Sequence, residues 1–406
     1  MGPFKLHYNF RDLFLAPRLG LSGKKIWVFI LGNLIGFVFY WIFSYLSLVI
    51  AGFNLTDSIR DYGLYPCLFG HEAQWHSWLV YYCGIIIWIF MIMLSSTAVS
   101  RITLKQLKGN DFFSGNDGWA YAYKHWKAVV LSPLTILLII AFFIIFAGVF
   151  ALMSSIPYLG EIIFAIPYLL YFFGSVFTIY TFFVLFVSLL FSPSIVGVYE
   201  EDTIGTVFNS YSITIGQGWR VIVYHLLLMP LILLSLEIMY WFWMNSIGFI
   251  NYVFGFDWLM GEKLSNITTH ASSIIFTPWI VDLISCLRTT ITDSIGLVYV
   301  LPKFFPYEFQ SQSINLSMME TISSVILSIS YFLIGLSIVS YGLSIVSVGQ
   351  TIMFIIFKKK SDDDDLLIRL DEDEIEDEIE DEIEDEIEEL DDQENISGDD
   401  NEQKDK

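Results

Sequence analysis

Six long apolar stretches limit what this 406-residue chain can fold into. A helix needs about 20 mostly apolar residues to cross the ~30 Å hydrocarbon core of a bilayer. The backbone N–H and C=O groups in that core must hydrogen-bond one another, which restricts spanning segments to helices or closed β-barrels. The strands of a membrane barrel alternate apolar and polar residues over about 10 positions, so long continuous apolar runs predict helices. We therefore expect an all-α fold, a polytopic membrane helix bundle of about six transmembrane helices with interfacial amphipathic helices. The predicted spans are 26–51, 78–100, 128–153, 163–192, 221–245 and 322–357.

The distribution of Lys and Arg predicts how the bundle is oriented. With the N-terminus inside, the inner segments hold 14 of the basic residues, and the outer loops hold only Arg60, Lys263, Arg288 and Lys303. Basic residues concentrate in cytoplasmic loops. We expect a multi-pass protein of the plasma (inner) membrane with both termini in the cytoplasm.

Charge divides the chain into an apolar body and an acidic tail. The formal net charge is −22, but residues 361–406 contain 26 Asp and Glu against 3 Lys and Arg, which leaves the rest at +1. A near-neutral body lacks the basic excess that binding to nucleic acid requires. We predict a basic interfacial N-terminal arm over 1–25 and a membrane domain over 26–357 with a large outer loop at 246–321. An acidic, low-complexity cytoplasmic tail follows over 358–406.

The acidic tail is predicted to be disordered. Its isoleucines recur every four residues from Ile375 to Ile387, which gives no straight helical seam. Glutamates spaced four apart, from Glu374 to Glu386, repel one another on a helix. A flexible anionic segment of this kind is suited to binding a basic cytoplasmic protein or divalent cations. The alternative is a replication-slippage tract that only aids solubility.

Three segments leave the topology open. Residues 322–357 are longer than one bilayer crossing, so they form either one long helix, which we favour, or a hairpin. Residues 271–287 are apolar but contain Pro278 and Asp282, and we interpret them as an amphipathic helix on the outer surface rather than a seventh span. Residues 1–25 mix Phe and Leu with basic residues, which indicates an interfacial helix on an anionic leaflet or, alternatively, an irregular arm.

The last apolar stretch contains a seven-residue repeat of small residues. Residues 335–349 read GLSIVSYGLSIVSVG, which places Gly335, Gly342 and Gly349 on one helix face and four serines on the opposite face. Small residues let helices approach closely in lipid. The repeat predicts a helix packed between two neighbours, either central in the bundle or at a homo-oligomer contact. A polar path lined by the serines is the alternative.

Two inner loops end in the same way. Each opens with an acidic residue and ends in Trp followed by a base, as Trp126-Lys127 before the third span and Trp219-Arg220 before the fifth. Because Trp sits at headgroup level and the base faces the cytoplasm, these pairs are predicted interface anchors, each preceded by an amphipathic inner helix. The likeness of the loops suggests an internal duplication, as in many transport folds.

These loops also carry a resemblance to known proteins. An amphipathic inner helix followed by a Gly-x-Trp-Arg or Trp-basic start of a span resembles a broad group of uncharacterised bacterial six-span membrane proteins. The group is similar to the membrane domain fused to some glycerophosphodiester phosphodiesterases. The resemblance implies the six-span topology but no chemistry, because this chain contains no hydrolase domain. The residues that carry it are Asp202, Ser212, Gly216, Trp219, Arg220, Asp117, Trp126 and Lys127, with the opening segment 10–20.

The first outer loop contains the residues best suited to bind a metal ion. Cys67, His71, Glu72 and His76 supply four candidate ligands within ten residues. The two histidines are five positions apart, about 140° around a helix, so the zinc-protease pattern is not met. A loop with scattered polar residues is the alternative. A disulfide between Cys67 and Cys286, both in outer segments, is a further hypothesis.

Glu237 is the acidic residue that falls inside a predicted span. An ionisable group within a membrane helix is a candidate for proton or cation transport. Its position 17 residues past Arg220 places it about 25 Å along the helix and near the outer interface. We interpret Glu237 as a carboxylate facing the interface, and a proton or cation relay, for which Glu237 is the transport candidate, is the alternative.

Taken together, these features predict an integral membrane protein without catalytic residues or a cofactor. We expect a membrane scaffold or accessory subunit rather than an enzyme, embedded in the lipid bilayer, with the tail as its interaction element. A small-solute or lipid transporter is the alternative, and Glu237 or the serine face would carry it. An enzyme acting at the outer loops would need the metal site at 67–76. A dry, closed bundle would favour the scaffold, whereas a polar cavity at mid-membrane would favour transport.

Overall fold

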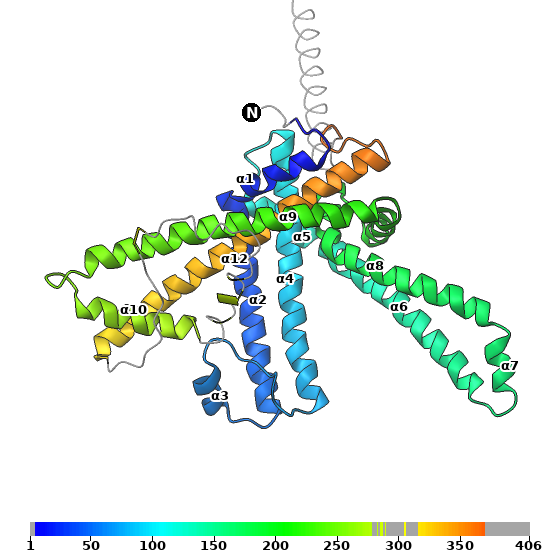
Figure 1. Cartoon of the computed structure of the whole chain (residues 1–406), viewed down its shortest axis with the longest axis horizontal. Helices are drawn as coiled ribbons and strands as arrows, with labels where there is room; N and C mark the ends of the chain where they lie inside the picture. The colour runs from blue at the N-terminus through cyan, green and yellow to red at the C-terminus, as the bar shows by residue number, and fades with distance from the viewer. Residues whose placement is uncertain are drawn as a thin grey trace, which may run out of the picture.

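All regular structure in the described part of the chain is helical, which confirms the predicted all-α class (Figure 1). This computed structural model describes residues 5–277, 282, 285, 286, 289, 304, 305 and 316–369. The helices are η1 (Phe10–Leu15), α1 (Ala16–Gly20), α2 (Gly23–Ile50), α3 (Leu55–Tyr62), α4 (Trp75–Lys108), α5 (Gly115–Lys124), α6 (Trp126–Ser154), α7 (Gly160–Ala165), α8 (Tyr168–Tyr199), α9 (Thr203–Phe254), α10 (Glu262–Ile275) and α12 (Met318–Ser361).

Six helices are long and apolar enough to cross a membrane, and these six confirm the predicted number among the described residues. They are α2, α4, α6, α8, α9 and α12. Their ends differ from the predicted spans because several helices continue into polar segments. Helix α4 runs to Lys108, where Gly109 adopts a left-handed conformation with φ 99° and ends it. Helix α8 begins at Tyr168 because 160–165 form the separate α7 and Pro167 precedes the new helix.

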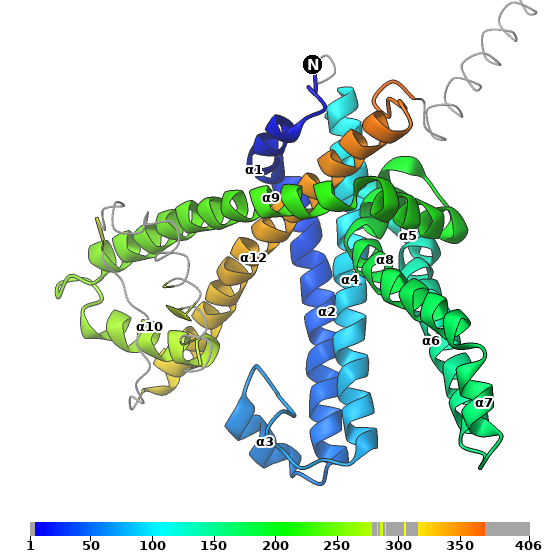
Figure 2. The ribbon, with the colours of Figure 1, turned by 45° about the vertical axis from the view of Figure 1, so that its right-hand side comes forward.

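The spans form three helical pairs that meet at one end and diverge at the other (Figures 1 and 2). The α2–α4 pair carries α3 at its tip, and the α6–α8 pair carries α7. Helices α9 and α12 form the third pair, with α10 packed on α12. Both views place the N-terminal helices and the ends of α4 and α12 at the meeting end. We call the meeting end the hub and the three diverging pairs the limbs.

The hub contains an extended cluster of buried apolar side chains. The cluster draws on η1, α1, α2, α4, α5, α8, α9 and α12. Helix α12 runs through it, and Ile352, Phe354 and Phe357 are at most 1% exposed. A helix that is buried on every side belongs to the core of a protein. Helices η1 and α1 and the last described helix, α12, therefore share one core.

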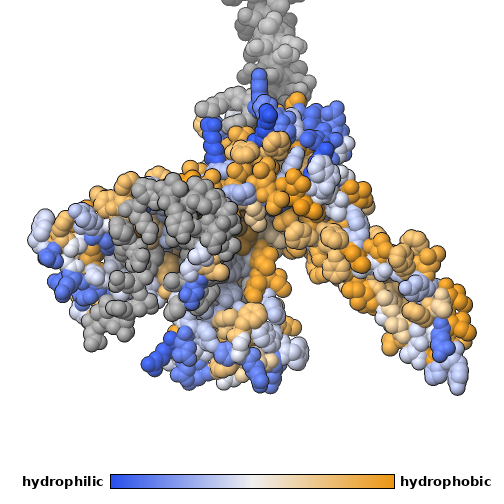
Figure 3. Space-filling view, in the orientation of Figure 1, coloured by the Kyte–Doolittle hydropathy of each residue, from blue (hydrophilic) through white to orange (hydrophobic). Residues whose placement is uncertain are grey.

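The limbs direct apolar side chains outward. In the α6–α8 limb Phe142, Ile145 and Leu152 are 62%, 67% and 74% exposed. Figure 3 shows apolar surface along much of this limb. Lipid tails are as apolar as these side chains, so such a surface suits the interior of a bilayer. The six apolar helices and this surface indicate an integral, multi-pass membrane protein.

Helix α9 differs from the sequence expectation. The structure has one continuous helix from Thr203 to Phe254, about 78 Å long, where the sequence predicts an inner surface helix followed by a separate span. The physical reason is that one face stays buried across the expected break. Ile213, Gln217 and Val221, spaced four apart, are 5%, 6% and 4% exposed. Packing on the hub therefore continues without interruption and so does the helix.

The other open segments have different outcomes. Residues 318–361 form the single helix α12 rather than a hairpin, and Ser317 and Glu320 cap its start reciprocally. The helix predicted over 271–287 overlaps the end of α10, and the described residues 282, 285 and 286 within it are also helical. Much of the rest of that segment, and the tail from residue 370 onward, lie outside the described residues.

Candidate interaction site at the hub

A buried ion pair joins two limbs at the hub. Arg101 on α4 is fully buried, and its Nη1 lies 2.7 Å from Oε1 of Glu200, whose side chain is 12% exposed. Glu200 directly follows α8 and adopts a left-handed conformation with φ 59°. The Tyr121 ring of α5 lies 4.5 Å from Arg101 Cζ, and the Tyr121 hydroxyl donates to the Val196 carbonyl at 2.7 Å. The ion pair joins α4 to the end of α8, and Tyr121 adds α5 to this contact. Loss of either charged partner would leave the other charge buried and unpaired, which is costly.

A layer of buried hydroxyl groups lies next to Arg101, and it includes Ser100, the residue before it. Ser96 donates to Ser347 Oγ at 3.0 Å, and Thr351 donates to Ser100 Oγ at 3.0 Å. Ser100 Oγ also lies 3.4 Å from the hydroxyls of Ser194 and Ser347. These side chains come from α4, α8 and α12 and are at most 8% exposed. Their hydrogen bonds are made within the protein, so the layer fastens three helices together across the hub.

The two faces of α12 pack against different neighbours. On the serine face, the Ser344 hydroxyl donates to the Gly20 carbonyl of α1 at 2.9 Å. On the glycine face, a Cβ added at Gly342 would meet Leu236 of α9 at 3.3 Å. A Cβ at Gly349 would meet Leu228 of α9 at 2.6 Å, which shows how close the two helices lie. Gly335 faces open space in the limb.

The start of the acidic tail is built into the hub. We call residues 358–369 the tail root. Leu366 is 2% exposed and belongs to the hub cluster. The Tyr8 hydroxyl donates to Asp365 Oδ1 at 2.6 Å, and Lys108 Nζ donates to the Arg369 carbonyl at 2.6 Å. The tail root therefore connects the N-terminal arm to the end of α4.

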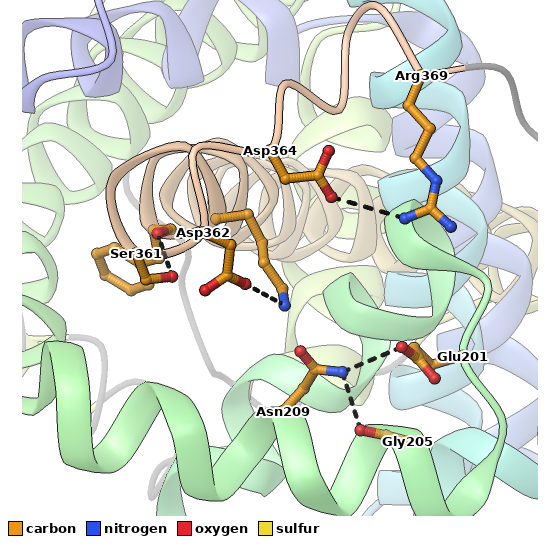
Figure 4. Close-up of polar contacts among 9 residues, drawn as sticks. Glu201, Gly205, Asn209, Ser361, Asp362, Asp364 and Arg369 are labelled. Carbon is orange, nitrogen blue, oxygen red and sulfur yellow. Dashed lines mark hydrogen bonds and ion pairs between the residues drawn. The ribbon is translucent and has the colours of Figure 1, made fainter.

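Charged side chains of the tail root gather around Tyr199 at the end of α8. Lys358 Nζ lies 4.5 Å and Arg369 Cζ lies 4.4 Å from the centre of its ring. Lys358 Nζ lies 2.8 Å from Asp362, and Arg369 Nη1 lies 3.6 Å from Asp364. Figure 4 shows the chain curving back after Asp362, so that Asp364 and Arg369 face each other. A cation over an aromatic face is attracted to it, so both bases favour this docked position.

The turn between α8 and α9 carries its own polar support beside the tail root. Asn209 Nδ2 donates to Glu201 Oε1 at 3.3 Å and to the Gly205 carbonyl at 2.9 Å (Figure 4). Asp202 caps α9 by accepting from the Gly205 N–H at 2.7 Å. These bonds fix the first turn of α9 where it passes the tail root.

Two pKa values are shifted by contacts of the tail root. Burial and the hydrogen bond to Asp365 raise the pKa of the Tyr8 phenol above its ordinary value. The hydrogen bond from Lys358 lowers the pKa of the Asp362 carboxyl below its ordinary value. Both directions favour the protonation states that the geometry uses at neutral pH, a protonated phenol and an ionised carboxylate.

The four residues predicted to bind a metal lie in the α3–α4 loop and at the start of α4. The Tyr62 hydroxyl hydrogen-bonds with His71 Nε2, and the Tyr81 hydroxyl donates to Cys67 Sγ at 3.8 Å. Glu72 is exposed, and the ring of His76 lies beside Trp75. Within the described ranges, no three His, Cys, Asp or Glu side chains are grouped so that they could hold a metal ion. The metal site and the Cys67–Cys286 disulfide stay predictions.

The transport and anchor candidates occupy separate places. Glu237 is partly buried on α9, next to Leu236, which packs against Gly342. Trp126 and Lys127 begin α6, and Trp126 is 38% exposed. Trp219 and Arg220 lie inside α9, where Trp219 is 62% exposed and Arg220 Cζ lies 5.0 Å from its ring. The structure brings none of these predicted residues into the tail-root contacts described above.

The seven-residue repeat predicts the glycine and serine faces of α12, whereas the ion pair and the tail-root contacts are not predicted. Arg101 was counted among the inner basic residues, and nothing in its local pattern signals complete burial. One signal was available, since Arg101 directly follows the apolar stretch 78–100 and Glu200 is the first charged residue after 162–199. Two opposite charges at equal depth on different helices are candidates for an ion pair. Tyr8 and Tyr199 carry no comparable signal.

Comparison with known proteins adds no relative to this description. No protein-family model matches the sequence, and neither the curated proteins nor the solved structures contain a match.

Proposed function

We propose that this protein is a membrane scaffold or accessory subunit that holds an acidic cytoplasmic segment for a basic partner protein. One observation carries the proposal, namely that the tail root is part of the folded hub. Leu366 is buried, and Asp365 and Arg369 make the polar contacts with the arm and α4. A tail that does not present its acidic residues to a partner would not need a first segment packed into the folded hub. The anionic residues that follow therefore start from a defined point beside the arm.

The closed packing of the hub supports the same proposal. The hydroxyl layer of α4, α8 and α12 bonds internally, and α12 fills the centre of the hub with apolar side chains. A transport route through this region would require these contacts to separate. The packing therefore favours a fixed support for the tail over a moving gate.

A small-solute or lipid transporter is the second candidate. It is favoured by Ser340, whose hydroxyl is buried on α12 without a hydrogen-bond partner among the described residues, and by Glu237, an ionisable group on a spanning helix. A buried hydroxyl of this kind suits a site that a polar solute or water could occupy. In this alternative the limbs would move relative to one another around the hub.

The scaffold proposal is tested by comparing three forms of the intact membrane protein. The forms are the full chain, a chain ending at Arg369, and a chain whose acids after 370 are replaced by Asn and Gln at unchanged length. Each is purified from crosslinked membranes and separately tested for binding of a lysine-rich peptide. We expect both altered forms to lose the same bound proteins and the peptide, with binding by the full chain weakened by salt. Equal recovery from all three forms would exclude the tail as the interaction element.

A further inference from the structure

The N-terminal arm, residues 5–22, has one buried and one exposed face. Leu13 and Ala16 are fully buried in the hub cluster, whereas Phe10, Phe14 and Leu21 are 50%, 55% and 55% exposed. Large apolar side chains gathered on an exposed face indicate contact with something outside the chain. We infer that this exposed face binds the headgroup region of an anionic lipid surface. The inference concerns the arm and does not rest on the function proposed for the tail.

The charge of the exposed face is positive. Arg11 and Arg18 are exposed on η1 and α1. Asp12 is the one acidic residue between positions 5 and 25, and it is 3% exposed. Its carboxylate accepts from the backbone N–H groups of His7 and Asn9 at 3.1 and 3.2 Å. The acid is thus turned inward and bonded, so the face presents two guanidinium groups among aromatic rings, which suits anionic headgroups.

The two lysines that follow the arm are engaged inside the protein. Lys24 Nζ donates to the carbonyls of Asp111 and Phe113 at 3.0 and 2.9 Å. Lys25 is buried, and its Nζ donates to the Leu19 carbonyl at 3.1 Å. Lys25 therefore joins the start of α2 to the arm, and Lys24 joins it to the α4–α5 loop. Binding of an external anion falls to the exposed arginines.

The position of the arm fits the level of lipid headgroups. Helix α2 begins at Gly23, directly after the arm, and is one of the six helices able to cross a membrane. Trp27, in the second turn of α2, is 57% exposed. Trp gathers at the boundary between headgroups and hydrocarbon. Chain continuity therefore keeps the exposed face of the arm within a few residues of that boundary.

The arm is held in place before any lipid binds. A Cβ at Gly20 would meet the Ile345 side chain of α12 at 3.1 Å, so the two helices lie in close contact. The hydroxyls of Tyr341 and Ser344 donate to the carbonyls of Pro17 and Gly20 at 3.3 and 2.9 Å. A surface that is already ordered loses little conformational entropy on binding.

The acidic tail is the competing occupant of this face. The contact between Tyr8 and Asp365 places the start of the tail beside the arm. Charge alone does not distinguish the tail from an anionic lipid. The exposed Phe10, Phe14 and Leu21 favour lipid, because the tail offers them single isoleucines spaced four apart among Asp and Glu, whereas a bilayer offers continuous hydrocarbon.

The inference is tested by lipid titration of the purified full chain. Phosphatidylglycerol or phosphatidylcholine is added in detergent, and bound lipid is counted by native mass spectrometry. We expect preferential binding of phosphatidylglycerol that weakens with salt, and a loss of about fivefold in its affinity for each of Arg11→Gln and Arg18→Gln. Phosphatidylcholine binding should not change. Arg60→Gln on α3 is the matched control, since Arg60 is an exposed base in a limb.

The possible results separate the two occupants. Equal binding of the two lipids by the full chain overturns the inference. So does an unchanged preference for phosphatidylglycerol in the variant that combines Arg11→Gln and Arg18→Gln. If a lipid preference emerges only in a chain ending at Arg369, the tail covers the arm and the inference is overturned for the intact protein. An Arg11→Lys, Arg18→Lys variant keeps the charge and should keep the preference, which guards against a folding defect in the Gln variant.

Discussion

The hub and the limbs bury their residues to different degrees, and α12 shows both patterns along one helix. In the limb, Met318 and Ile326 are 79% and 62% exposed. In the hub, Ile345 and Met353 of the same helix are fully buried, and Ser347 and Gly349 lie among them. Along α12, large apolar side chains thus face outward in the limb, whereas in the hub apolar, small and hydroxyl-bearing residues are buried together.

This difference shows where the stability of the fold resides. In a bilayer, burying apolar side chains does not by itself drive helices together, because lipid is equally apolar. Close packing and hydrogen bonds must supply the preference for the folded arrangement. The hub has both, in the Arg101–Glu200 pair and the hydroxyl layer. Matched substitutions in hub and limb should therefore have unequal effects.

The largest difference is expected for the buried ion pair. Arg101→Ala leaves Glu200 with little access to water and without its partner, which should lower the free energy of unfolding by about 3–5 kcal/mol. Arg60→Ala on α3, an exposed base in a limb, should change it by less than about 0.5 kcal/mol. Unfolding by SDS in mixed micelles measures both. Replacing both partners, as Arg101→Met with Glu200→Gln, should recover part of the lost stability. Equal effects of Arg101→Ala and Arg60→Ala would contradict the difference between hub and limb.

Helix packing provides the second test. Gly349→Leu forces a side chain into Leu228 of α9, where even a Cβ would lie 2.6 Å away. Overpacking of this kind should cost about 1–3 kcal/mol. Gly335→Leu on the same helix points into open space and should be nearly neutral in the same SDS unfolding assay. A larger loss at Gly335 than at Gly349 would show that the limb makes contacts this comparison neglects.

Hydropathy was sufficient to predict the six long apolar helices and the class of the fold. Runs such as 128–153 are apolar over the length of a bilayer core, and that property depends on the run alone. The long helix α12 followed from the same reasoning. The continuity of α9 did not, because it depends on Ile213, Gln217 and Val221 meeting the hub. Sequence patterns report local periodicity, whereas this continuity is a tertiary effect.

The ion pair and the tail-root contacts were not predicted, for a related reason. The burial of Arg101 depends on the place where Glu200 ends up, and the two are almost a hundred positions apart. The pairing of Tyr8 with Asp365 links opposite ends of the chain. Asp365 lies in a run of four aspartates that composition assigns to a solvated tail. Only the folded arrangement distinguishes the members of such a run.

A third, smaller difference is expected at the tail root. Tyr8→Phe removes the hydrogen bond to Asp365 and should lower the free energy of unfolding by about 1 kcal/mol. It should also raise the rate at which a protease cleaves near residue 369, because the tail root is released. Tyr158→Phe is the limb control, since Tyr158 is 91% exposed. Identical cleavage rates in the two variants would contradict a tail root fixed through Tyr8.

The smallest effect is a dependence of stability on pH at Asp362. The hydrogen bond from Lys358 lowers the pKa of this carboxyl in the folded state, so its contribution exists above the ordinary Asp pKa of about 4. It is lost as the pH falls through the lowered value, where the carboxylate becomes protonated. Because Asp362 is 44% exposed, the contribution at pH 7 should stay below about 1 kcal/mol. Unfolding measured from pH 7 to pH 3 should show wild type and Asp362→Asn converging toward low pH. Lys358→Gln should remove the same pH-dependent contribution to the free energy of unfolding. Parallel curves for wild type and Asp362→Asn would show that the Lys358–Asp362 contact does not stabilise the folded tail root.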